Sequence, residues 1–352
     1  MLEGVPFPAS LSGPRAARLV CMDMRYHLFG RTGLRVSELL LGTMGLGFRD
    51  PGEVRRVVDA YADAGGNVLD TASAYGEGEA VLGSVIERRD RFVLATKYTL
   101  SRDAADPNGA GNHRKNLVLS LERSLRRLRT DYVDILWVHV WDRHTPVEET
   151  MRALDDLVRA GKVLYVGMSD APAWVVAHAN TLAQWHGWTP FAGLQLRYNL
   201  LDRDIERELL PMAEAFGLSV AAWAPLAAGK LSGAAETGAS SRFDPGALTE
   251  RERAAARAVR EVADELSATP AQVALAWTRA KSQAVLPLVG VSTVEQLTDN
   301  LGALALTLPT EAIARLENAV DFRLGFPHDF IAESQPSSFV FGDAATRVVP
   351  RG

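Results

Sequence analysis

The chain has 352 residues, 47% of them hydrophobic and 23% charged, which is the composition of an ordinary soluble globular protein. Its formal net charge of −5 gives no basic field that would favour nucleic acid as a partner. The single cysteine, Cys21, excludes an internal disulfide and a cysteine-based zinc site, and it favours a reducing, cytoplasmic setting. No apolar run approaches the roughly 20 residues that a membrane-spanning helix needs, so we expect no membrane partner.

Residues 1–24 differ from the rest of the chain. They contain Pro6, Pro8 and Pro14 but no continuous apolar stretch of the kind found in a signal peptide. We interpret them as a disordered N-terminal extension or a misplaced start, because Met22 and Met24 offer later starts just before the first patterned segment. A short transit peptide is the alternative.

From residue 25 onward, short apolar runs alternate with longer amphipathic runs, a pattern typical of parallel strands joined by helices. The runs 25–29 and 34–36 flank a turn with two glycines and predict a small β-hairpin. Eight further strands are predicted at residues 39–41, 68–69, 92–95, 135–138, 163–166, 193–196, 219–223 and 284–288. Helices are predicted at residues 52–64, 79–88, 114–129, 147–160, 172–184, 205–216, 250–266, 270–281 and 294–301.

Eight strand–helix units without a linker-like composition break predict one (β/α)₈ TIM barrel over residues 25–330, followed by a C-terminal tail over residues 331–352. A doubly wound sheet has the same local pattern. The glycine run from Gly42 to Gly47, however, has neither the dinucleotide-binding spacing nor the P-loop spacing. Residues 226–249 and the tail after Phe322 are long for loops, and we expect loops of this length to cover a site on the catalytic face.

Four titratable residues fall at or just after the predicted ends of neighbouring strands. Asp70 ends the second barrel strand, Lys97 the third and His139 the fourth, while Tyr75 lies in the loop after the second. Because catalytic groups of TIM barrels lie at the carboxyl ends of the strands, these four side chains should point into one mouth.

This set suits the reduction of a carbonyl group. Hydride attack builds negative charge on the carbonyl oxygen, so a proton donor must stand at that oxygen, and Tyr75 is the candidate. We expect Lys97 to lower the pKa of the Tyr75 phenol, because a nearby cation favours the ionised form, and Asp70 to keep Lys97 charged. His139 can donate a hydrogen bond that orients the substrate oxygen.

Each of these residues alone also has a structural explanation. An aspartate after a strand is a common cap, a lysine at a strand end is usually solvated, and a lone histidine is more often part of the core. The convergence of four such residues on successive strand ends favours the catalytic interpretation.

The motifs around these residues resemble the aldo-keto reductase family over residues 25–330. They are Val68-Leu69-Asp70-Thr71-Ala72 with Tyr75-Gly76, Glu79 and Leu82-Gly83, then Val93-Leu94-Ala95-Thr96-Lys97, then Asp131-Tyr132-Val133-Asp134 leading to His139 and Asp142. The resemblance implies that Asp70, Tyr75, Lys97 and His139 form the catalytic tetrad. The runs 139–142 and 325–330 are most similar to the aryl-alcohol-dehydrogenase-like branch.

The resemblance also implies a nicotinamide cofactor, NADP(H) in preference to NAD(H), and no metal. The loop beneath the nicotinamide ribose corresponds to Gly42, Thr43 and Met44, and the carboxamide ligands to Ser169, Asp170 and Gln195, with Trp223 stacked on the nicotinamide. The pyrophosphate loop corresponds to Ala224, Pro225, Leu226, Gly229 and Lys230. The 2′-phosphate end corresponds to Gly290, Ser292 and Gln296, and the adenine contacts to Asp299 and Asn300.

Two of these positions depart from the family pattern. Asp170 stands where relatives usually have Asn, and an ionised carboxylate cannot donate to the carboxamide oxygen. Ser292 stands where many relatives have Arg or Lys, so a 2′-phosphate would depend on the helix N-terminus, Ser292 and Gln296, with less selectivity over NAD(H) than an arginine gives.

We expect an aromatic substrate pocket suited to aryl or medium-sized aliphatic aldehydes and ketones. Its lining is predicted to include Met44, Phe48, Trp137, Trp141 and Trp223, joined by residues from the tail. The alternative for Trp137 is that it points into the helix packing, since side chains alternate along a strand.

The expected function is therefore NAD(P)H-dependent reduction of a carbonyl group with Tyr75 as proton donor. Two rivals use the same barrel: a cofactor-sensing regulatory or channel-associated subunit with little turnover, and an isomerase or aldolase in which Lys97 forms a Schiff base. The sequence leaves open the physiological substrate, the direction in the cell, the selectivity for NADP over NAD and the oligomeric state.

Overall fold

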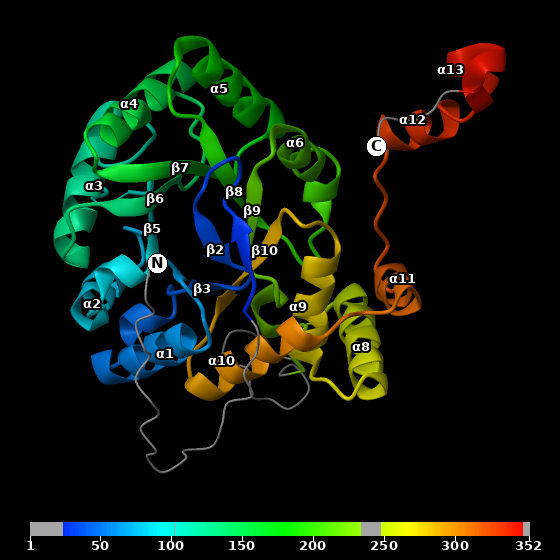
Figure 1. The fold of residues 1–352 in the computed structure, drawn as a ribbon, viewed down its shortest axis with the longest axis horizontal. Coiled ribbons are helices and arrows are strands. Elements are labelled where there is room, and N and C mark those ends of the chain that lie inside the picture. The colour runs from blue at the N-terminus through cyan, green and yellow to red at the C-terminus, as the bar shows by residue number, and fades with distance from the viewer. Residues whose placement is uncertain (1–23, 102, 234–247, 348–352) are drawn as a thin grey trace, which may run out of the picture.

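The computed structural model describes residues 24–101, 103–233 and 248–347. Most of the predicted extension and part of the 226–249 loop lie outside these ranges, so the predicted limits 1–24, 25–330 and 331–352 stay predictions. No helix in the described ranges is long and apolar enough to cross a membrane. Figure 1 shows a ring of helices around a central barrel of strands.

The barrel is closed by eight parallel strands in the order β10-β3-β4-β5-β6-β7-β8-β9. This confirms the predicted (β/α)₈ fold. The strands are β3 (Leu40–Gly42), β4 (Val68–Asp70), β5 (Val93–Tyr98), β6 (Val133–Val138), β7 (Val163–Ser169), β8 (Phe191–Arg197), β9 (Ser219–Trp223) and β10 (Val285–Gly290).

The helices of the ring follow these strands. They are α1 (Pro51–Asp63), α2 (Gly78–Val85), α3 (Arg114–Leu128), α4 (Val147–Arg159), α5 (Ala173–His186), α6 (Leu209–Phe216), α8 (Glu250–Glu265), α9 (Pro270–Ala280), α10 (Val294–Leu301) and α11 (Thr310–Asn318). The predicted helix 205–216 is split, because a 3₁₀ turn, η3 (Asp204–Glu206), precedes α6. Further helices that we did not predict, α11, α12 (His328–Ser334) and α13 (Ser338–Phe341), follow the last barrel unit.

Apolar side chains fill two layers, one inside the barrel and one between the strands and the helices. Strands buried on both faces read as nearly continuous hydrophobic runs, which is why they were visible in the sequence. Helix ends carry local signals too: Thr269 caps α9 with a capping box closed by Gln272, and Pro270 opens the helix.

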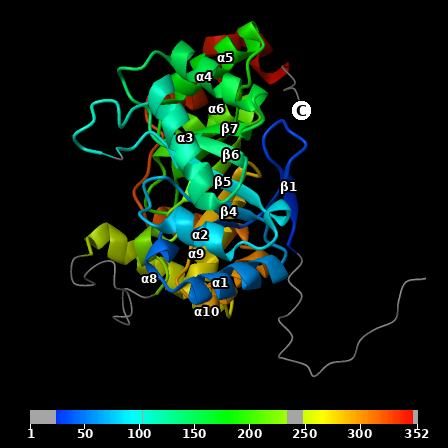
Figure 2. The ribbon, with the colours of Figure 1, turned by 90° about the vertical axis from the view of Figure 1, so that its left-hand side faces the viewer.

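The predicted hairpin, β1 (Tyr26–Leu28) with β2 (Arg35–Ser37), lies across one end of the barrel, in front in Figure 1 and at one side in Figure 2. Phe29 is 3% exposed and its ring meets Trp137 edge-on at 5.9 Å between centroids. The Gly30 amide donates to Ser219 Oγ at 2.8 Å, at the start of β9. The hairpin therefore closes the amino-terminal end of the barrel and leaves the carboxyl end for a site.

Candidate active site

The four predicted catalytic residues come together at the carboxyl end of the barrel. Asp70 is the last residue of β4, Lys97 lies near the end of β5 and His139 follows β6. The His139 amide donates to the carbonyl of Tyr98 at 3.1 Å, which holds the histidine against β5. The ring of Tyr75 meets that of His139 edge-on, with 6.0 Å between centroids.

Lys97 and Asp70 form a buried ion pair at the centre of this group. The Lys97 ammonium donates to Asp70 Oδ2 and, at 2.8 Å, to the carbonyl of Thr71. It also lies 5.0 Å from the centre of the Tyr75 ring. Only 1% of Lys97 is exposed, so its charge depends on these partners. A lysine held this way is a poor Schiff-base nucleophile, because its amine is charged and bonded.

The pKa of the Tyr75 phenol is raised rather than lowered. Burial is the largest cause, and Lys97 opposes it while the Asp70 carboxylate adds to it. Our expectation of a net lowered pKa was therefore wrong, because it counted the Lys97 charge but not the desolvation of the phenol. Tyr75 keeps its proton at neutral pH, as a proton donor must.

His139 is neutral at physiological pH. Burial and then the charge of Lys97 lower its pKa to about 4. A neutral imidazole has one N–H donor and one acceptor nitrogen. Its Nδ1 is buried without a hydrogen-bond partner among the described residues, so donation to an atom in the mouth falls to Nε2.

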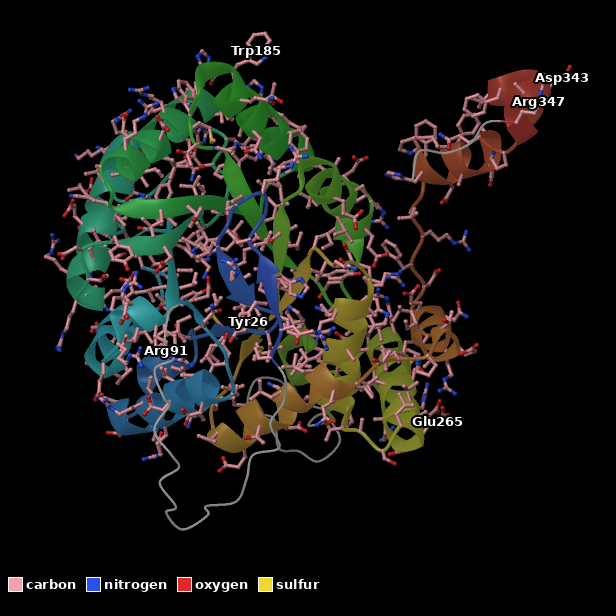
Figure 3. The ribbon with its side chains drawn as sticks, viewed as in Figure 1. Tyr26, Arg91, Trp185, Glu265, Asp343 and Arg347 are labelled. Atoms are coloured by element: carbon pink, nitrogen blue, oxygen red, sulfur yellow. The ribbon has the colours of Figure 1, made fainter. Side chains whose placement is uncertain are left out.

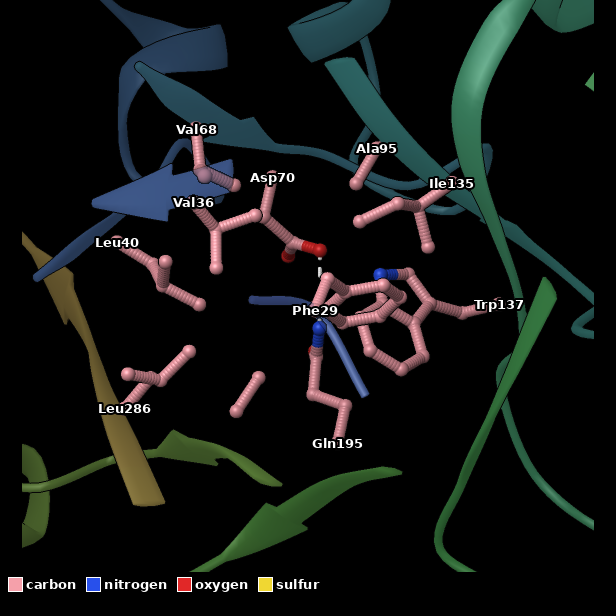
Figure 4. A pocket seen from close by; sticks show the side chains of 11 residues that line it. Phe29, Val36, Leu40, Val68, Asp70, Ala95, Ile135, Trp137, Gln195 and Leu286 are labelled. Carbon is pink, nitrogen blue, oxygen red and sulfur yellow. Dashed lines mark hydrogen bonds between the residues drawn. The ribbon is translucent and has the colours of Figure 1, made fainter. Parts of the chain in front are cut away.

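Gln195 has a role that the sequence did not reveal. Its side-chain amide donates to Asp70 Oδ1 at 2.9 Å, as the dashed line in Figure 4 shows. The Asp70 carboxylate is thus held from two sides, by Lys97 and by Gln195. One of its two side-chain N–H groups is used in this way, and the Gln195 amide oxygen can accept from a carboxamide N–H.

Asp170 and Trp223 form the next part of the mouth. The indole N–H of Trp223 donates to Asp170 Oδ1 at 3.2 Å, and the guanidinium of Arg197 lies 4.6 Å from the centre of the indole. Burial raises the pKa of Asp170, against the opposing effects of Trp223 and Arg197. Ser169 is 1% exposed and its hydroxyl donates to the carbonyl of Gln195 at 2.7 Å.

These groups fit a nicotinamide ring in the donor and acceptor types that they offer. The indole of Trp223 gives a flat surface, and Asp170 and Gln195 offer acceptors for a carboxamide N–H. The hydroxyl of Ser169 is already engaged with a carbonyl, so the donor for the carboxamide oxygen is the weakest part of the fit.

The loop after β3 lies beside the tetrad. The amide and the hydroxyl of Thr43 both donate to the carbonyl of Asp70, at 2.9 and 3.0 Å. Gly42 pairs with Asp70 across β3 and β4, and the following Met44 is 50% exposed. The three residues expected beneath the ribose therefore adjoin Asp70.

The predicted pyrophosphate loop has an unusual backbone. Ala224, Ala227, Ala228 and Gly229 all have positive φ angles, and this conformation gives concave backbone geometries that suit anions. Lys230 forms an ion pair with Glu252, so its charge is already partly matched. Pro225 and Leu226 complete the loop, and the latter half of the predicted 226–249 loop lies outside the described residues.

The predicted 2′-phosphate end lies at the start of α10. Gly290 ends β10, and the Ser292 amide donates to the side chain of Gln296 at 2.7 Å, so the glutamine already caps this turn. Asp299 accepts from Thr269 and Gln272 of the neighbouring helix, at 2.9 and 3.0 Å, which gives it a structural role in addition to the predicted one. Asn300 is 4% exposed, and contact of either residue with adenine stays a prediction.

Trp137 does not line the mouth. It is 2% exposed and lies inside the barrel against Phe29, around a small cavity that also touches Asp70 and Gln195 (Figure 4). The expectation of a substrate contact was wrong, and so was the alternative of helix packing. Trp137 pairs with Lys97 across β5 and β6 and so points inward, below the layer that faces the mouth.

The other predicted pocket residues lie in loops at the mouth. Phe48 is 84% exposed, and Trp141 meets Trp174 of α5 edge-on at 5.6 Å between centroids. The sequence reasoning missed Trp174 and Arg197, although both fall just after or at a strand end, where mouth residues are expected. It also missed Asn112, whose amide and side-chain oxygen pair with Asp142 at 2.6 and 2.7 Å and tie two mouth loops together.

The family model for the aldo/keto reductase family matches residues 38–321, which include every element of the barrel and all four tetrad positions. The chain belongs to the aldo/keto reductase family. It is therefore an oxidoreductase that reduces carbonyl groups. The described residues contain no group of three or more His, Cys, Asp or Glu side chains that could hold a metal ion.

Curated relatives agree with the assignment to this family and with the aryl-alcohol-dehydrogenase-like branch. A norsolorinic acid reductase of Emericella nidulans is 43% identical, over 90% of this chain and 86% of the relative. A norsolorinic acid reductase of Aspergillus parasiticus is 37% identical, over 89% of this chain and 86% of the relative. A protein named putative aryl-alcohol dehydrogenase of Saccharomyces cerevisiae is 37% identical, over 86% and 88%.

Proposed function

We propose that this aldo/keto reductase uses NADPH to reduce aromatic aldehydes and ketones, with Tyr75 as the proton donor. The observation that carries the proposal is the buried Lys97–Asp70 ion pair, which lies beside the phenol of Tyr75. Burying two charges carries a large desolvation penalty, so buried ion pairs next to a titratable group are typical of catalytic sites.

In the proposed reaction NADPH, when bound, supplies the hydride to the carbonyl carbon. His139 donates a hydrogen bond to the carbonyl oxygen and holds it near Tyr75. The Tyr75 phenol transfers its proton to that oxygen as negative charge develops there. Lys97 then stabilises the phenolate left behind, and Asp70, held by Gln195, keeps Lys97 charged.

The proposed substrate class rests on the aromatic side chains of the mouth. Phe48, Trp141, Trp174 and Trp223 offer flat apolar surfaces around the tetrad loops, and such surfaces favour aryl groups. The names of the relatives, which refer to an aryl alcohol and to norsolorinic acid, support the same class. Small molecules are the expected partners.

The preference for NADPH over NADH and the cellular compartment are finer proposals. NADPH is favoured by the N-terminus of α10, which lies next to Ser292 and the exposed side chain of Gln296. A reducing compartment, the cytosol, is favoured by the single cysteine.

The decisive experiment is Tyr75→Phe, assayed by NADPH oxidation with 4-nitrobenzaldehyde. We expect kcat to fall at least about 100-fold, because the variant lacks the proton donor but keeps the ring. NADPH binding, measured by quenching of tryptophan fluorescence, should be unchanged.

Tyr26→Phe is the matched control, because this exposed tyrosine of β1 donates to the carbonyl of Gly65, just after α1. It should keep full turnover. Full turnover in Tyr75→Phe would refute Tyr75 as the donor. If the wild type bound NADPH but turned over no carbonyl in a broad panel, the cofactor-sensing alternative would replace the proposal.

A further inference from the structure

The chain ends in a projecting segment, residues 324–347, which we call the C-terminal arm. It contains α12, α13 and the 3₁₀ helix η7 (Gly342–Arg347), and Figures 1 and 3 show it projecting beyond α6 and α11. At the start of α12, His328 Nε2 lies 3.4 Å from Glu208 Oε1, next to α6. This differs from our expectation that the tail would help to line the pocket of its own barrel.

The surface of the arm that faces water carries many apolar side chains. Its ring pairs Phe326–Phe330 and Phe330–Phe339 lie 6.4 Å apart between centroids, and the rings still face water. Apolar side chains that are 38–86% exposed run along the whole arm: Leu324, Phe326, Phe330, Ile331, Phe339, Val340 and Phe341. An exposed patch of this kind marks an interaction surface.

The base of the arm is held in a fixed direction. The Arg207 guanidinium donates to the carbonyls of Arg323 at 2.9 Å and Leu324 at 3.1 Å. Arg203 and Arg207 lie over the ring of Phe322, at 4.6 and 4.9 Å from its centre. These contacts bind the start of the arm to η3 and the start of α6, in the segment that follows β8, and from there the arm projects outward beyond α6 (Figure 1).

The mouth presents a second exposed apolar surface, which we call the rim and define as Met44, Phe48, Trp141 and Trp174. Met44, Phe48 and Trp174 are 50%, 84% and 61% exposed. Met44 and Phe48 follow β3, Trp141 follows β6 and Trp174 lies in the first turn of α5 after β7, so the rim residues come from the carboxyl end of the barrel, as the tetrad does. One chain therefore carries two exposed apolar surfaces, the arm and the rim. The contacts of Arg203 and Arg207 at the base of the arm keep the two apart.

Their charges are complementary. The arm exposes three carboxylates, Asp329, Glu333 and Asp343, against the single cation Arg347. Three exposed arginines lie at or next to the rim, against the exposed carboxylates of Asp50 and Glu53: Arg49 follows Phe48, Arg143 lies 5.9 Å from the Trp141 ring, and Arg197 lies over the neighbouring Trp223. Arg49 also lies 3.9 Å from Glu53, and this exposed pair is weak.

We propose that the C-terminal arm docks across the rim of a second copy of this chain and completes that copy's substrate pocket. A two-fold exchange would cover two arms and two rims at once, which is how symmetric dimers satisfy a pair of complementary surfaces. The role of the arm in the pocket rests on the proposed function. The docking itself does not.

The first test is the solution mass by light scattering. We expect the wild type to be a dimer and the double variant Phe330→Ser/Phe339→Ser to be a monomer. Trp185→Ser is the matched control, because Trp185 is 84% exposed on the outer face of α5 (Figure 3), and it should stay dimeric. A monomeric wild type, or a dimer that the double variant leaves intact, would overturn the proposal.

The second test locates the contact. In a Cys21→Ser background, a chain carrying both Phe48→Cys and Phe339→Cys should form a disulfide-linked dimer on oxidation, seen on a non-reducing gel. The control pair Trp185→Cys/Phe339→Cys should not. A disulfide within a monomer would mean that the arm folds over its own mouth, and no disulfide would mean that it docks elsewhere; both refute the proposal.

The third test, of enzyme activity, asks whether the docked arm contributes to the substrate pocket. The double variant should raise the KM for an aromatic aldehyde several-fold with little change in kcat, since the tetrad is untouched. An unchanged KM in the monomeric variant would refute the role in the pocket. If the wild type failed to reduce carbonyls while the disulfide-linked dimer formed, the proposed function would be refuted and the docking of the arm would be supported.

Discussion

His139 illustrates how burial sets the charge of a residue in this mouth. Its imidazole is largely buried and is close enough to the Lys97 ammonium to be affected by its charge, and both effects favour the neutral form. In the unfolded chain the same imidazole would titrate at its usual value of 6.5. Folding therefore releases a proton from this residue at mildly acidic pH, which makes the stability of the fold depend on pH.

This difference gives a testable loss of stability. The folded pKa is lowered from 6.5 to about 4, so the contribution is complete above pH 6.5 and is lost as the pH falls toward 4. Between pH 7 and pH 4.5 the wild type should lose about 2 kcal/mol more free energy of unfolding than His139→Gln, measured by urea denaturation. Parallel losses in the two proteins would show that His139 is not held neutral.

Among single residues, the sequence predicted positions better than contacts. Asp70, Lys97 and His139 were found because polar residues at the ends of apolar strands stand out. The hydrogen bond from Gln195 to Asp70 was not predicted, because it joins residues 125 positions apart in the sequence. Tyr75 was placed correctly, but the direction of its pKa was not, since desolvation depends on packing that a motif does not reveal.

Among the elements, the hairpin shows what local patterns convey and what they omit. Two short runs around a glycine-containing turn predicted it, but not its position as the floor of the barrel. Gly30 makes the close approach: its φ is +57°, and a Cβ there would lie 2.1 Å from the backbone oxygen of Ala192 in β8. Only glycine fits this contact.

We therefore expect Gly30→Ala to destabilise the protein by about 3 kcal/mol, from left-handed strain together with the clash. Gly33→Ala is the control in the same turn, because a Cβ at Gly33 meets nothing within 4 Å. Its free energy of unfolding should match that of the wild type. Equal stability of the two variants, by urea denaturation, would mean that the hairpin does not pack tightly on β8.

At the scale of the whole molecule, the number and order of barrel strands followed from eight apolar runs, because strands buried on both faces leave a clear trace. The direction of the C-terminal arm left none, since it depends on where Arg203 and Arg207 bring the chain around Phe322. The predicted cofactor site also depends on the whole barrel, because its residues lie on several units, from Asp170 after β7 to α10 after β10.

If α10 is the 2′-phosphate end of that site, as we propose, its residues set the preference for NADPH over NADH. Ser292 and Gln296 offer a 2′-phosphate only neutral groups and a helix N-terminus, and Glu295 in the first turn of α10 opposes it. Ser292→Arg should lower the Kd for NADPH about tenfold and leave that for NADH unchanged, because a charge-assisted bond to phosphate contributes about 1.5–3 kcal/mol.

A ligand that binds only the folded state stabilises the protein more as its concentration rises. The tighter binding of NADPH by Ser292→Arg should therefore appear as a larger rise in Tm with NADPH than with NADH. Thr298→Arg is the matched control: it adds the same charge to an exposed position further along α10, beyond the first turn. It should alter neither Kd by more than about twofold, since an exposed charge acts weakly at a distance. If Ser292→Arg tightened both cofactors equally, the 2′-phosphate would lie elsewhere on the barrel.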